Sequence, residues 1–367
     1  MSRRQGDSNS ASVPPDIFDV APQGGDPRHL PASVQVDLST CVSRYGPPPS
    51  ALAALRDASA TLLRSHPYGA SEQLTEAYGR FLGVPAHELV AGRGASELIW
   101  LLAGSPLAPR VAVPVPAYTE YRQAFPRAAA GEAAVHHRLE LVSDLLEADR
   151  VVLISNPHNP SGRAFTAAEL GQALMAARGR GVLVVDESYV EFVNVPGEYS
   201  MIGQAFENLL VVRSPSKFFG VAGARVGVAW SPNPALRAAL TVRRGSWPVS
   251  GLEVAPVAAA LGDRCWQAES HAALQADSAW LAQQLVAIWG SDAAGGAVID
   301  GAVTHFRLVS GEAAGLAPRL ATAGIAVRTL GRGHGLELPA VRIAAPRVEE
   351  RALVAAALAA VADGSSR

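Results

Sequence analysis

The middle of the chain alternates short apolar runs with segments of helical pattern, and this alternation restricts the fold more than any other feature. Apolar runs this short, several of them rich in valine, are typical of strands that are buried on both faces of a sheet. Strands separated by helical segments favour parallel pairing, because each helix carries the chain back across the sheet. We therefore predict an α/β fold with a mostly parallel sheet flanked by helices. The predicted strands are residues 111–115, 151–155, 181–186, 209–212 and 225–230, with a helix at 166–178.

The pattern changes after about residue 248, which predicts a second, smaller α+β domain. Long stretches rich in alanine and leucine predict helices, and short apolar runs between them predict strands. The expected helices cover 252–289 and 348–362, and the expected strands cover 304–308, 325–329 and 341–345. We expect residues 36–50 and 248–367 to form the small domain and residues 51–247 to form the large one.

The N-terminal part of the sequence divides into three segments that differ in composition and pattern. Residues 1–35 are rich in Ser, Pro, Gly, Asp and Gln without a sustained period, which predicts a mobile tail. The prolines at 47–49 predict an extended segment, because proline interrupts a helix. Helical spacing then predicts helices at about 50–64 and at 71–82, with Ser71 as the N-cap of the second.

Composition excludes several classes of protein. The formal net charge is −2 and no block of like charges occurs, which argues against a nucleic-acid partner. No apolar stretch reaches the roughly 18 residues that a membrane helix needs. Arg3 and Arg4 are not followed by the apolar region of a secretory signal. Cys41 and Cys265 have no metal-ligand spacing, so we expect no metal site and a reduced, cytoplasmic protein.

A polar segment that follows the predicted strand 209–212 carries the candidate chemistry. Lys217 is the only lysine in the chain, and a lysine amine can form a Schiff base with an aldehyde. Ser214 and Ser216 flank it and can donate hydrogen bonds to a phosphate, and Arg225 can bind the same phosphate bidentately. The segment is therefore apt for an aldehyde cofactor with a phosphate tail. Taken alone, it is also compatible with an ordinary solvated lysine.

A second phosphate-binding candidate is the turn formed by Gly94, Ala95 and Ser96, which joins a short apolar run to a helical pattern. A helix N-terminus offers free backbone N–H groups and the positive end of the helix dipole, which suit a phosphate. A plain strand-to-helix turn would look the same in sequence.

Further polar residues fall at the ends of other predicted strands, where an open α/β sheet binds its ligands. They are Tyr118, Asn159 in Asn-Pro-His-Asn-Pro-Ser-Gly, and Asp186 and Tyr189 in Asp-Glu-Ser-Tyr. Together with Ser-Pro-Ser-Lys, these motifs resemble the fold-type-I pyridoxal-phosphate enzymes. Within that group the chain is similar, from about residue 36 to its end, to the histidinol-phosphate aminotransferases and the L-threonine-O-3-phosphate decarboxylases.

The resemblance implies a role for each of these residues. Lys217 would hold pyridoxal 5'-phosphate and later move the substrate proton. Asp186 would face the pyridine nitrogen and keep it protonated, so that the ring withdraws electrons. Asn159 and Tyr189 would hydrogen-bond the ring oxygen, and Tyr118 would stack on the ring. The phosphate would lie among Gly94, Ala95, Ser96, Ser214, Ser216 and Arg225.

The substrate side departs from the family pattern. Arg342 resembles the arginine that grips the substrate carboxylate, or the phosphate of an amino-alcohol phosphate. Relatives read Asn-Pro-Tyr-Gly where this chain has Ser43, Arg44, Tyr45 and Gly46, and Tyr-Pro where it has His66-Pro67 followed by Tyr68. The resemblance implies that Arg44, Tyr45, His66 and Tyr68 border the substrate. It also implies a homodimer, because the second of these loops serves the neighbouring subunit in relatives.

Several functions remain open from the sequence. Our leading prediction is an aminotransferase acting on an amino acid and a 2-oxo acid, in specialised metabolism of unusual or guanidino amino acids. The alternatives are a histidinol-phosphate aminotransferase and a decarboxylase. The segment 246–250 favours the decarboxylase. The two chemistries differ in which bond of the substrate carbon stands perpendicular to the cofactor ring. A cofactor-sensing regulator would need a DNA-binding module, and the N-terminal segment is neither long nor basic enough for one.

Overall fold

The structure is a computed structural model that describes residues 25–26, 28, 30–58, 60–131, 136–290, 298, 301–310, 315–331, 334–336 and 339–363. The predicted mobile tail 1–35 therefore lies largely outside the described residues. Within the described part, no helix has the length and apolar character needed to cross a membrane.

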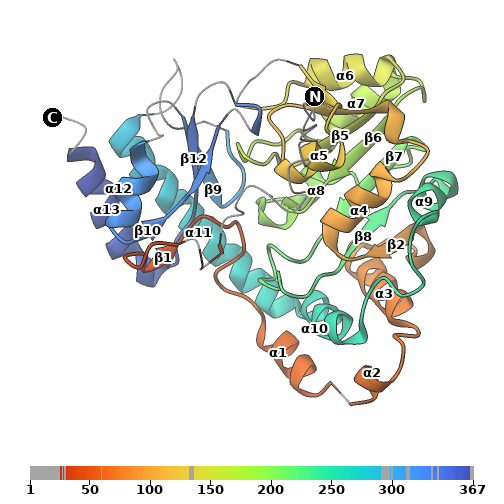
Figure 1. The fold of residues 1–367 in the computed structure, drawn as a ribbon, viewed down its shortest axis with the longest axis horizontal. Coiled ribbons are helices and arrows are strands. Elements are labelled where there is room, and N and C mark those ends of the chain that lie inside the picture. The colour runs from red at the N-terminus through yellow and green to blue at the C-terminus, as the bar shows by residue number, and fades with distance from the viewer. Residues whose placement is uncertain are drawn as a thin grey trace, which may run out of the picture.

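The large sheet forms as predicted from the alternating pattern (Figure 1). Neighbouring strands are parallel from β7 to β4, whereas β8 runs antiparallel to both β7 and β2. The order across the sheet is β2 (Leu89–Gly92), β8 (Gly227–Trp230), β7 (Leu209–Arg213), β6 (Val182–Asp186), β5 (Val151–Ser155), β3 (Val111–Pro114) and β4 (Ala129–Ala130).

Both faces of the large sheet are buried, which explains its continuous apolar strands. In β6, for example, Leu183 and Val185 belong to one apolar core, while Val182 and Val184 belong to the other. Alternate residues of a strand point to opposite faces, so each strand contributes to both layers. The first core includes helices α6 (Leu139–Glu147) and α7 (Ala167–Ala176), and the second includes α4 (Gly94–Ala103), α5 (Thr119–Ala124) and α9 (Pro234–Thr241).

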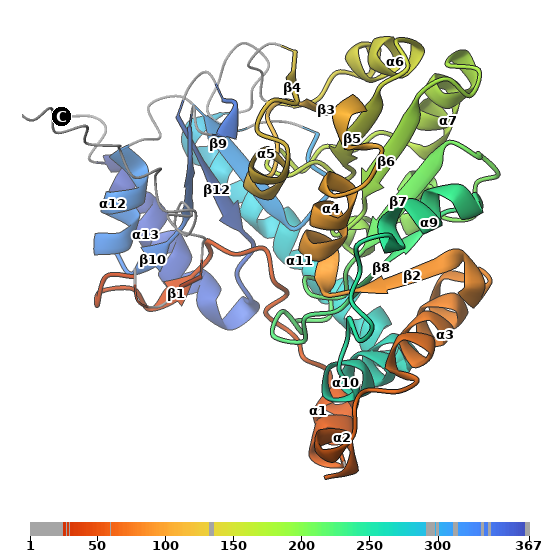
Figure 2. The ribbon, with the colours of Figure 1, turned by 45° about the vertical axis from the view of Figure 1, so that its right-hand side comes forward.

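A small three-stranded antiparallel sheet lies beside the large one, as Figure 2 shows. Its order is β11 (Arg328–Leu330), β12 (Ala340–Ala344) and β9 (Phe306–Ser310). A separate parallel pair joins β1 (Val36–Asp37) to β10 (Ile325–Ala326), so the N-terminal segment reaches the C-terminal half. The helices here are α12 (Leu316–Thr322) and α13 (Arg351–Asp363), and the long α11 (Arg264–Trp289) packs on α13 and β9.

The remaining helices form a lobe below the large sheet in Figure 1. They are α1 (Pro49–Arg56), α2 (Thr61–Arg64), α3 (Ala70–Leu82) and α10 (Gly251–Gly262), which packs on α1 and α3. The short helix α8 (Pro196–Tyr199) lies outside this lobe and contacts α7.

Some predicted boundaries are wrong for local reasons. The predicted helix 50–64 is two helices, and Pro49 begins the first one, because proline at the first helical position loses no internal hydrogen bond. Gly69, not Ser71, caps α3, since the chain enters that helix with a φ of 77° that glycine accepts. The predicted strand 325–329 divides into β10 and β11, which pair with different partners.

Candidate active site

Lys217 lies just beyond the end of β7, against the N-terminal segment of the chain. Its carbonyl accepts a hydrogen bond of 2.7 Å from the Ser43 backbone N–H, which ties residues 43–46 to the lysine loop. Burial lowers the pKa of the Lys217 amine, and the guanidinium groups of Arg342 and Arg225 act in the same direction. A larger share of the amine is therefore neutral, the form that attacks an aldehyde.

Asp186 ends the adjacent strand β6 and is 5% exposed. One carboxylate oxygen accepts hydrogen bonds from the Ser188 backbone (3.0 Å) and hydroxyl (2.5 Å), and the other accepts one from Tyr121 (2.7 Å). Burial raises the pKa of Asp186, while these donors and Lys217 oppose the rise. A cation placed beside this carboxylate would favour its ionised form, as a protonated pyridine nitrogen would.

The predicted phosphate site is assembled from two loops. Gly94 begins α4 with a φ of 77°, and a Cβ at this position would lie 3.1 Å from Nη2 of Arg225. Glycine therefore allows the arginine to reach the helix N-terminus, where backbone N–H groups are free. On the other loop, the Ser214 hydroxyl donates to the Ser216 hydroxyl at 2.9 Å.

A cavity of about 150 Å³ joins these parts, with the carboxylate, the hydroxyl groups and arginine, and Lys217 all in its wall. This arrangement fits pyridoxal phosphate, which needs an anion at its ring nitrogen, donors at its phosphate and an amine at its aldehyde. The residues that line the cavity are Ala95, Ser96, Tyr118, Tyr121, Ser155, Asn159, Asp186, Ser188, Tyr189, Ser214, Ser216, Lys217, Ala222 and Arg225.

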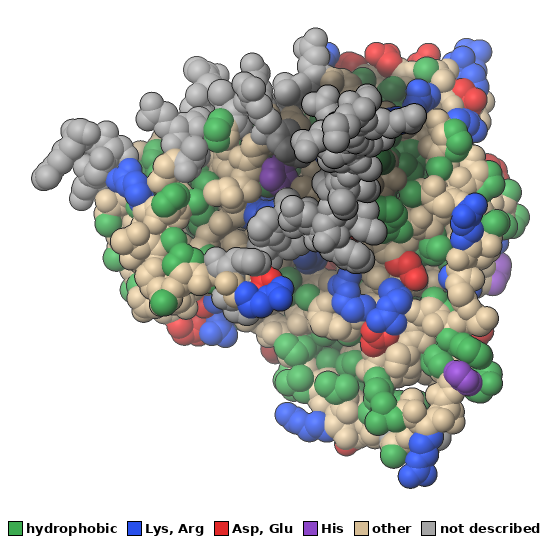
Figure 3. Space-filling model, viewed as in Figure 1, with side chains coloured by type: hydrophobic (Ala, Val, Ile, Leu, Met, Phe, Trp, Pro, Cys, Tyr) green, Lys and Arg blue, Asp and Glu red, His purple; other side chains and the backbone are tan. Residues whose placement is uncertain are grey.

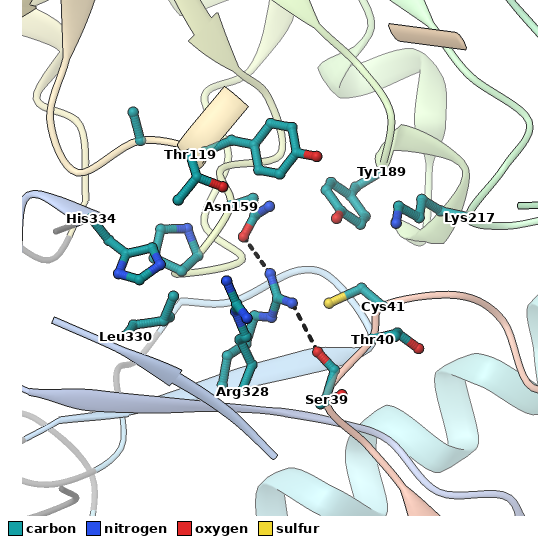
Figure 4. A pocket seen from close by; sticks show the side chains of 14 residues that line it. Ser39, Thr40, Cys41, Thr119, Asn159, Tyr189, Lys217, Arg328, Leu330 and His334 are labelled. Carbon is teal, nitrogen blue, oxygen red and sulfur yellow. Dashed lines mark hydrogen bonds between the residues drawn. The ribbon is translucent and has the colours of Figure 1, made fainter. Parts of the chain in front are cut away.

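A second cavity, of about 80 Å³, shares four of those side chains: Tyr118, Asn159, Tyr189 and Lys217. Burial raises the pKa of Tyr189 well above its usual value, so its phenol remains a hydrogen-bond donor. The second cavity extends from these side chains toward the small sheet (Figure 4).

The small sheet supplies two arginines to this second cavity. Arg328 on β11 and Arg342 on β12 are register partners, and both line it. Arg342 is 9% exposed and donates to Oδ1 of Asn159 (2.5 Å) and to the Ser39 carbonyl (3.1 Å). Burial, and then Arg342, lower the pKa of Arg328. Two guanidinium groups held this close favour an anion between them.

No carboxylate lines the second cavity within the described part of the chain, so its charged side chains are all cationic. Cys41 also lines this cavity, and burial raises the pKa of its thiol, which keeps it neutral. The other lining residues are Ser39, Thr40, Ala117, Thr119, Pro160, Leu330 and His334.

The structure does not bring Arg44 or Tyr45 into either cavity. The Arg44 guanidinium forms a salt bridge with Glu350 and also donates to the Asp37 carbonyl at 2.8 Å. The Tyr45 hydroxyl donates to Asp277 at 2.7 Å. Within one protomer, these two residues join the N-terminal segment to α11 and the C-terminal helices.

His66 and Tyr68 also lie outside both cavities of their own protomer. The His66 ring stacks on Trp247 with centroids 4.1 Å apart, and Tyr68 meets the same indole edge-on at 6.1 Å. Tyr68 is 74% exposed and Trp247 48% exposed, so the group presents aromatic surface to the outside.

Sequence reasoning missed Tyr121, Arg328 and His334. Tyr121 follows Tyr118 by three residues, a spacing that places two side chains on one helix face and could have signalled a shared role. Arg328 could not be recognised from sequence as a residue of the cavity wall, because its position depends on the pairing of β11 with β12. His334 follows a strand whose end the sequence did not define, and no local motif distinguishes this histidine from others.

Comparisons with known proteins agree with this geometry. The model of the family "Aminotransferase class I and II" matches residues 33–358. The chain is 33% identical to a histidinol-phosphate aminotransferase of Granulibacter bethesdensis over 364 residues, which cover 94% of this chain and 95% of that protein. It is 31% identical to histidinol-phosphate aminotransferase 1 of a Nostoc species over 270 residues, 70% of this chain and 74% of that protein.

Solved structures show the same fold. One is histidinol-phosphate aminotransferase of Sinorhizobium meliloti in complex with pyridoxal-5'-phosphate, with a TM-score of 0.77 at 22% identity over 90% of this chain and 92% of that one. Another is L-threonine-O-3-phosphate decarboxylase of Porphyromonas gingivalis, with a TM-score of 0.72 at 20% identity over 88% of this chain and 98% of that one.

The family match spans nearly the whole described chain, and the lysine, the buried carboxylate and the two loops predicted to bind the phosphate all surround one cavity. The chain belongs to the class I and II aminotransferase family, and it is a fold-type-I, pyridoxal-phosphate-dependent aminotransferase.

Proposed function

We propose that this enzyme moves an amino group between a phosphorylated amino alcohol of the histidinol-phosphate type and a 2-oxo acid. The observation that carries the proposal is the register pair Arg328 and Arg342, which line one cavity together with Lys217. The curated relatives reported above bear the same activity in their names.

The charge of the cavity favours a phosphate monoester over a simple amino acid. A carboxylate is a monoanion that one bidentate arginine can satisfy. A phosphate monoester carries a charge of about −1.5 to −2 at neutral pH and has more acceptor oxygens, so a second guanidinium is matched to it. Arg342 is directed by Asn159 and Ser39, and Arg328 lies next to it across the strand pair.

The same charges disfavour the guanidino amino acids that the sequence suggested. A cationic side chain would need an acidic neighbour, and the described residues in the cavity wall offer none. The histidinol-phosphate alternative therefore has more support than specialised metabolism of cationic amino acids.

Each residue of the site has a separate role in the proposed chemistry. Bound pyridoxal phosphate supplies an electron-withdrawing ring. We propose that Lys217 Nζ holds the cofactor aldehyde and then moves the substrate proton, since its lowered pKa lets it act as a base. Asp186 would hold the ring nitrogen, Tyr189 and Asn159 would orient the ring oxygen, and Arg225 would hold the cofactor phosphate.

A comparison of amino donors tests this function. Purified holoenzyme would be incubated with 2-oxoglutarate and either histidinol phosphate, histidinol, threonine phosphate or arginine, following glutamate formation and carbon dioxide release. We expect glutamate from histidinol phosphate at the highest kcat/KM and no carbon dioxide from threonine phosphate. Release of carbon dioxide as the main product would instead assign the decarboxylase activity. A preference for arginine would contradict the proposal.

We further propose that the enzyme is a homodimer that uses the lobe formed by α1, α2 and α10. Hydrophobic side chains gather on this lobe in Figure 3. Its exposed apolar residues include Leu52, Leu55, Leu62 and Leu63, beside the aromatic group of Tyr68 and Trp247. Apolar area of this kind is costly in water and favours burial against another protein.

The domain division into 51–247 and the two flanking segments, 36–50 and 248–367, is likewise a proposal, and β1 supports it by pairing with β10.

A further inference from the structure

His334 forms part of the cavity wall at the opposite end from Lys217 (Figure 4). It lies on the connection between β11 and β12, and its ring is beside Arg328 and Leu330 in the same view. An arm of a substrate that extends away from the lysine toward the two arginines would meet this ring.

The hydrogen bonds of the His334 ring define where its proton resides. The Gly331 backbone N–H donates to Nδ1 at 3.2 Å, so Nδ1 is an acceptor and a neutral ring carries its proton on Nε2. Burial lowers the pKa of His334 to about 4, and Arg328, Arg342 and Arg122 add to that effect, so the ring is neutral at pH 7. Nε2 is buried and has no hydrogen-bond partner among the described residues. The ring therefore holds an unused N–H donor in the wall of a cavity for an anion.

The backbone around His334 keeps the ring in this place. The His334 N–H donates to the Gly331 carbonyl at 2.8 Å, and the His334 carbonyl accepts from the Ala117 N–H at 3.2 Å. Gly335 has a φ of 82°, and a Cβ there would lie 2.9 Å from Cβ of Val115. The turn thus docks closely against the loop that follows β3, and only glycine allows that approach.

We propose that His334 is a specificity residue, whose Nε2–H donates to the anionic head of the substrate beside Arg328 and Arg342. This inference rests on the proposed function, because it assigns a third donor to the same phosphate. A phosphate monoester has three terminal oxygens, whereas a carboxylate has two that the arginines can already occupy. The third donor therefore discriminates between the phosphorylated amino donor and the dicarboxylate that shares the active site.

The test compares three replacements in the holoenzyme. His334→Phe keeps a ring but has no donor, and His334→Asn is polar but too short to reach the Nε2 position. His334→Gln places an amide N–H close to where Nε2 lies. His87→Phe, at an exposed histidine of the 3₁₀ turn Ala86–Glu88, is the matched control. The dissociation constant of histidinol phosphate would be measured from the change in cofactor absorbance, and KM from steady-state rates. Histidinol and glutamate serve as ligands without a phosphate.

We expect His334→Phe and His334→Asn to weaken histidinol phosphate binding by about 10-fold or more, the usual effect of losing a hydrogen bond to a charged group. The values for histidinol and glutamate should change by less than about 3-fold, and His334→Gln should recover most of the loss. Cofactor absorbance and melting temperature identify a variant that does not fold. If either His334→Phe or His334→Asn fails to fold, the result with the other one decides.

The outcomes separate the two proposals. If the wild-type enzyme binds histidinol phosphate no better than histidinol, the proposed function is wrong. If the wild type prefers the phosphate and both His334→Phe and His334→Asn keep that preference, the role of His334 is overturned. Equal losses for all three ligands would also overturn it, since that pattern indicates a structural residue.

Discussion

Replacing Arg328 by methionine should reduce the preference for a phosphorylated substrate while leaving the cofactor site in place. Methionine keeps the length and apolar body of the side chain and removes the guanidinium. Arg342 would retain its hydrogen bonds to Asn159 and Ser39, because neither of them involves Arg328. Asn159 would consequently stay over the cofactor cavity that it lines.

The size of the effect follows from burial. A hydrogen bond to a charged group contributes about 1.5–3 kcal/mol, which corresponds to roughly 10- to 100-fold in binding. Arg328 is only partly buried, so we expect the lower half of this range. Arg342→Met should cost about 2–5 kcal/mol, because Arg342 is 9% exposed and its loss leaves a buried anion without its main partner. It should also lower kcat, since Asn159 loses its partner.

The assay is kcat and KM for histidinol phosphate, histidinol and glutamate in both variants. For Arg328→Met we expect a higher KM for histidinol phosphate, an unchanged kcat and little change with histidinol. For Arg342→Met we expect losses with histidinol phosphate and glutamate alike, because both present an anion to it. If Arg328→Met lowers kcat/KM for all three by one common factor, the reasoning from the paired arginines is refuted.

Three further predictions concern the lysine, the N-terminal segment and the exposed aromatic group. Lys217→Arg should abolish amino transfer, and borohydride reduction with peptide mass mapping should find no cofactor adduct; an adduct at another residue would contradict the assignment. Arg44→Met should lower the free energy of unfolding by about 1 kcal/mol at pH 7 and leave the ranking of substrates unchanged. Burial acts to raise the pKa of Glu350, but hydrogen bonds from Arg44 and the Arg347 backbone outweigh it, so the pKa is lowered. The contribution of the pair is therefore present above the unfolded pKa and lost as pH falls through the folded one; urea unfolding at pH 7 and pH 3 should show the difference between the proteins shrink. Trp247→Arg should shift the enzyme toward monomer in sedimentation velocity, and an unchanged dimer would exclude this lobe as the interface.

The cofactor side of the site could be predicted from sequence because its residues lie at strand ends. Asp186 and Lys217 follow two apolar runs that pair as neighbours, β6 and β7, so their proximity is a consequence of parallel pairing. Lys217 had no competitor, since the chain has no other lysine. These signals lie within short segments, so they can be recognised without knowing how distant parts of the chain pack.

The substrate side could not be predicted in the same way. Arg44 looked available in sequence, but its partner Glu350 lies 306 residues away and becomes visible only in the folded chain. Arg328 and Arg342 meet through the register of two short strands, and the sequence had joined one of them to β10. His334 depends on a turn that is held by hydrogen bonds to Gly331 and Ala117. The proposed selectivity therefore depends on contacts between distant segments, which the sequence alone does not reveal.

The central claim is that the paired arginines make this aminotransferase selective for a phosphorylated amino alcohol. Its most direct test is a single-turnover experiment, in which holoenzyme without an oxo acid is mixed with histidinol phosphate or with histidinol. The visible absorbance of the cofactor reports transfer of the amino group. We predict that histidinol phosphate converts the cofactor completely, at a concentration at least about 10-fold lower than histidinol requires. Equal concentration dependence for the two donors, or no conversion by histidinol phosphate, would contradict the claim.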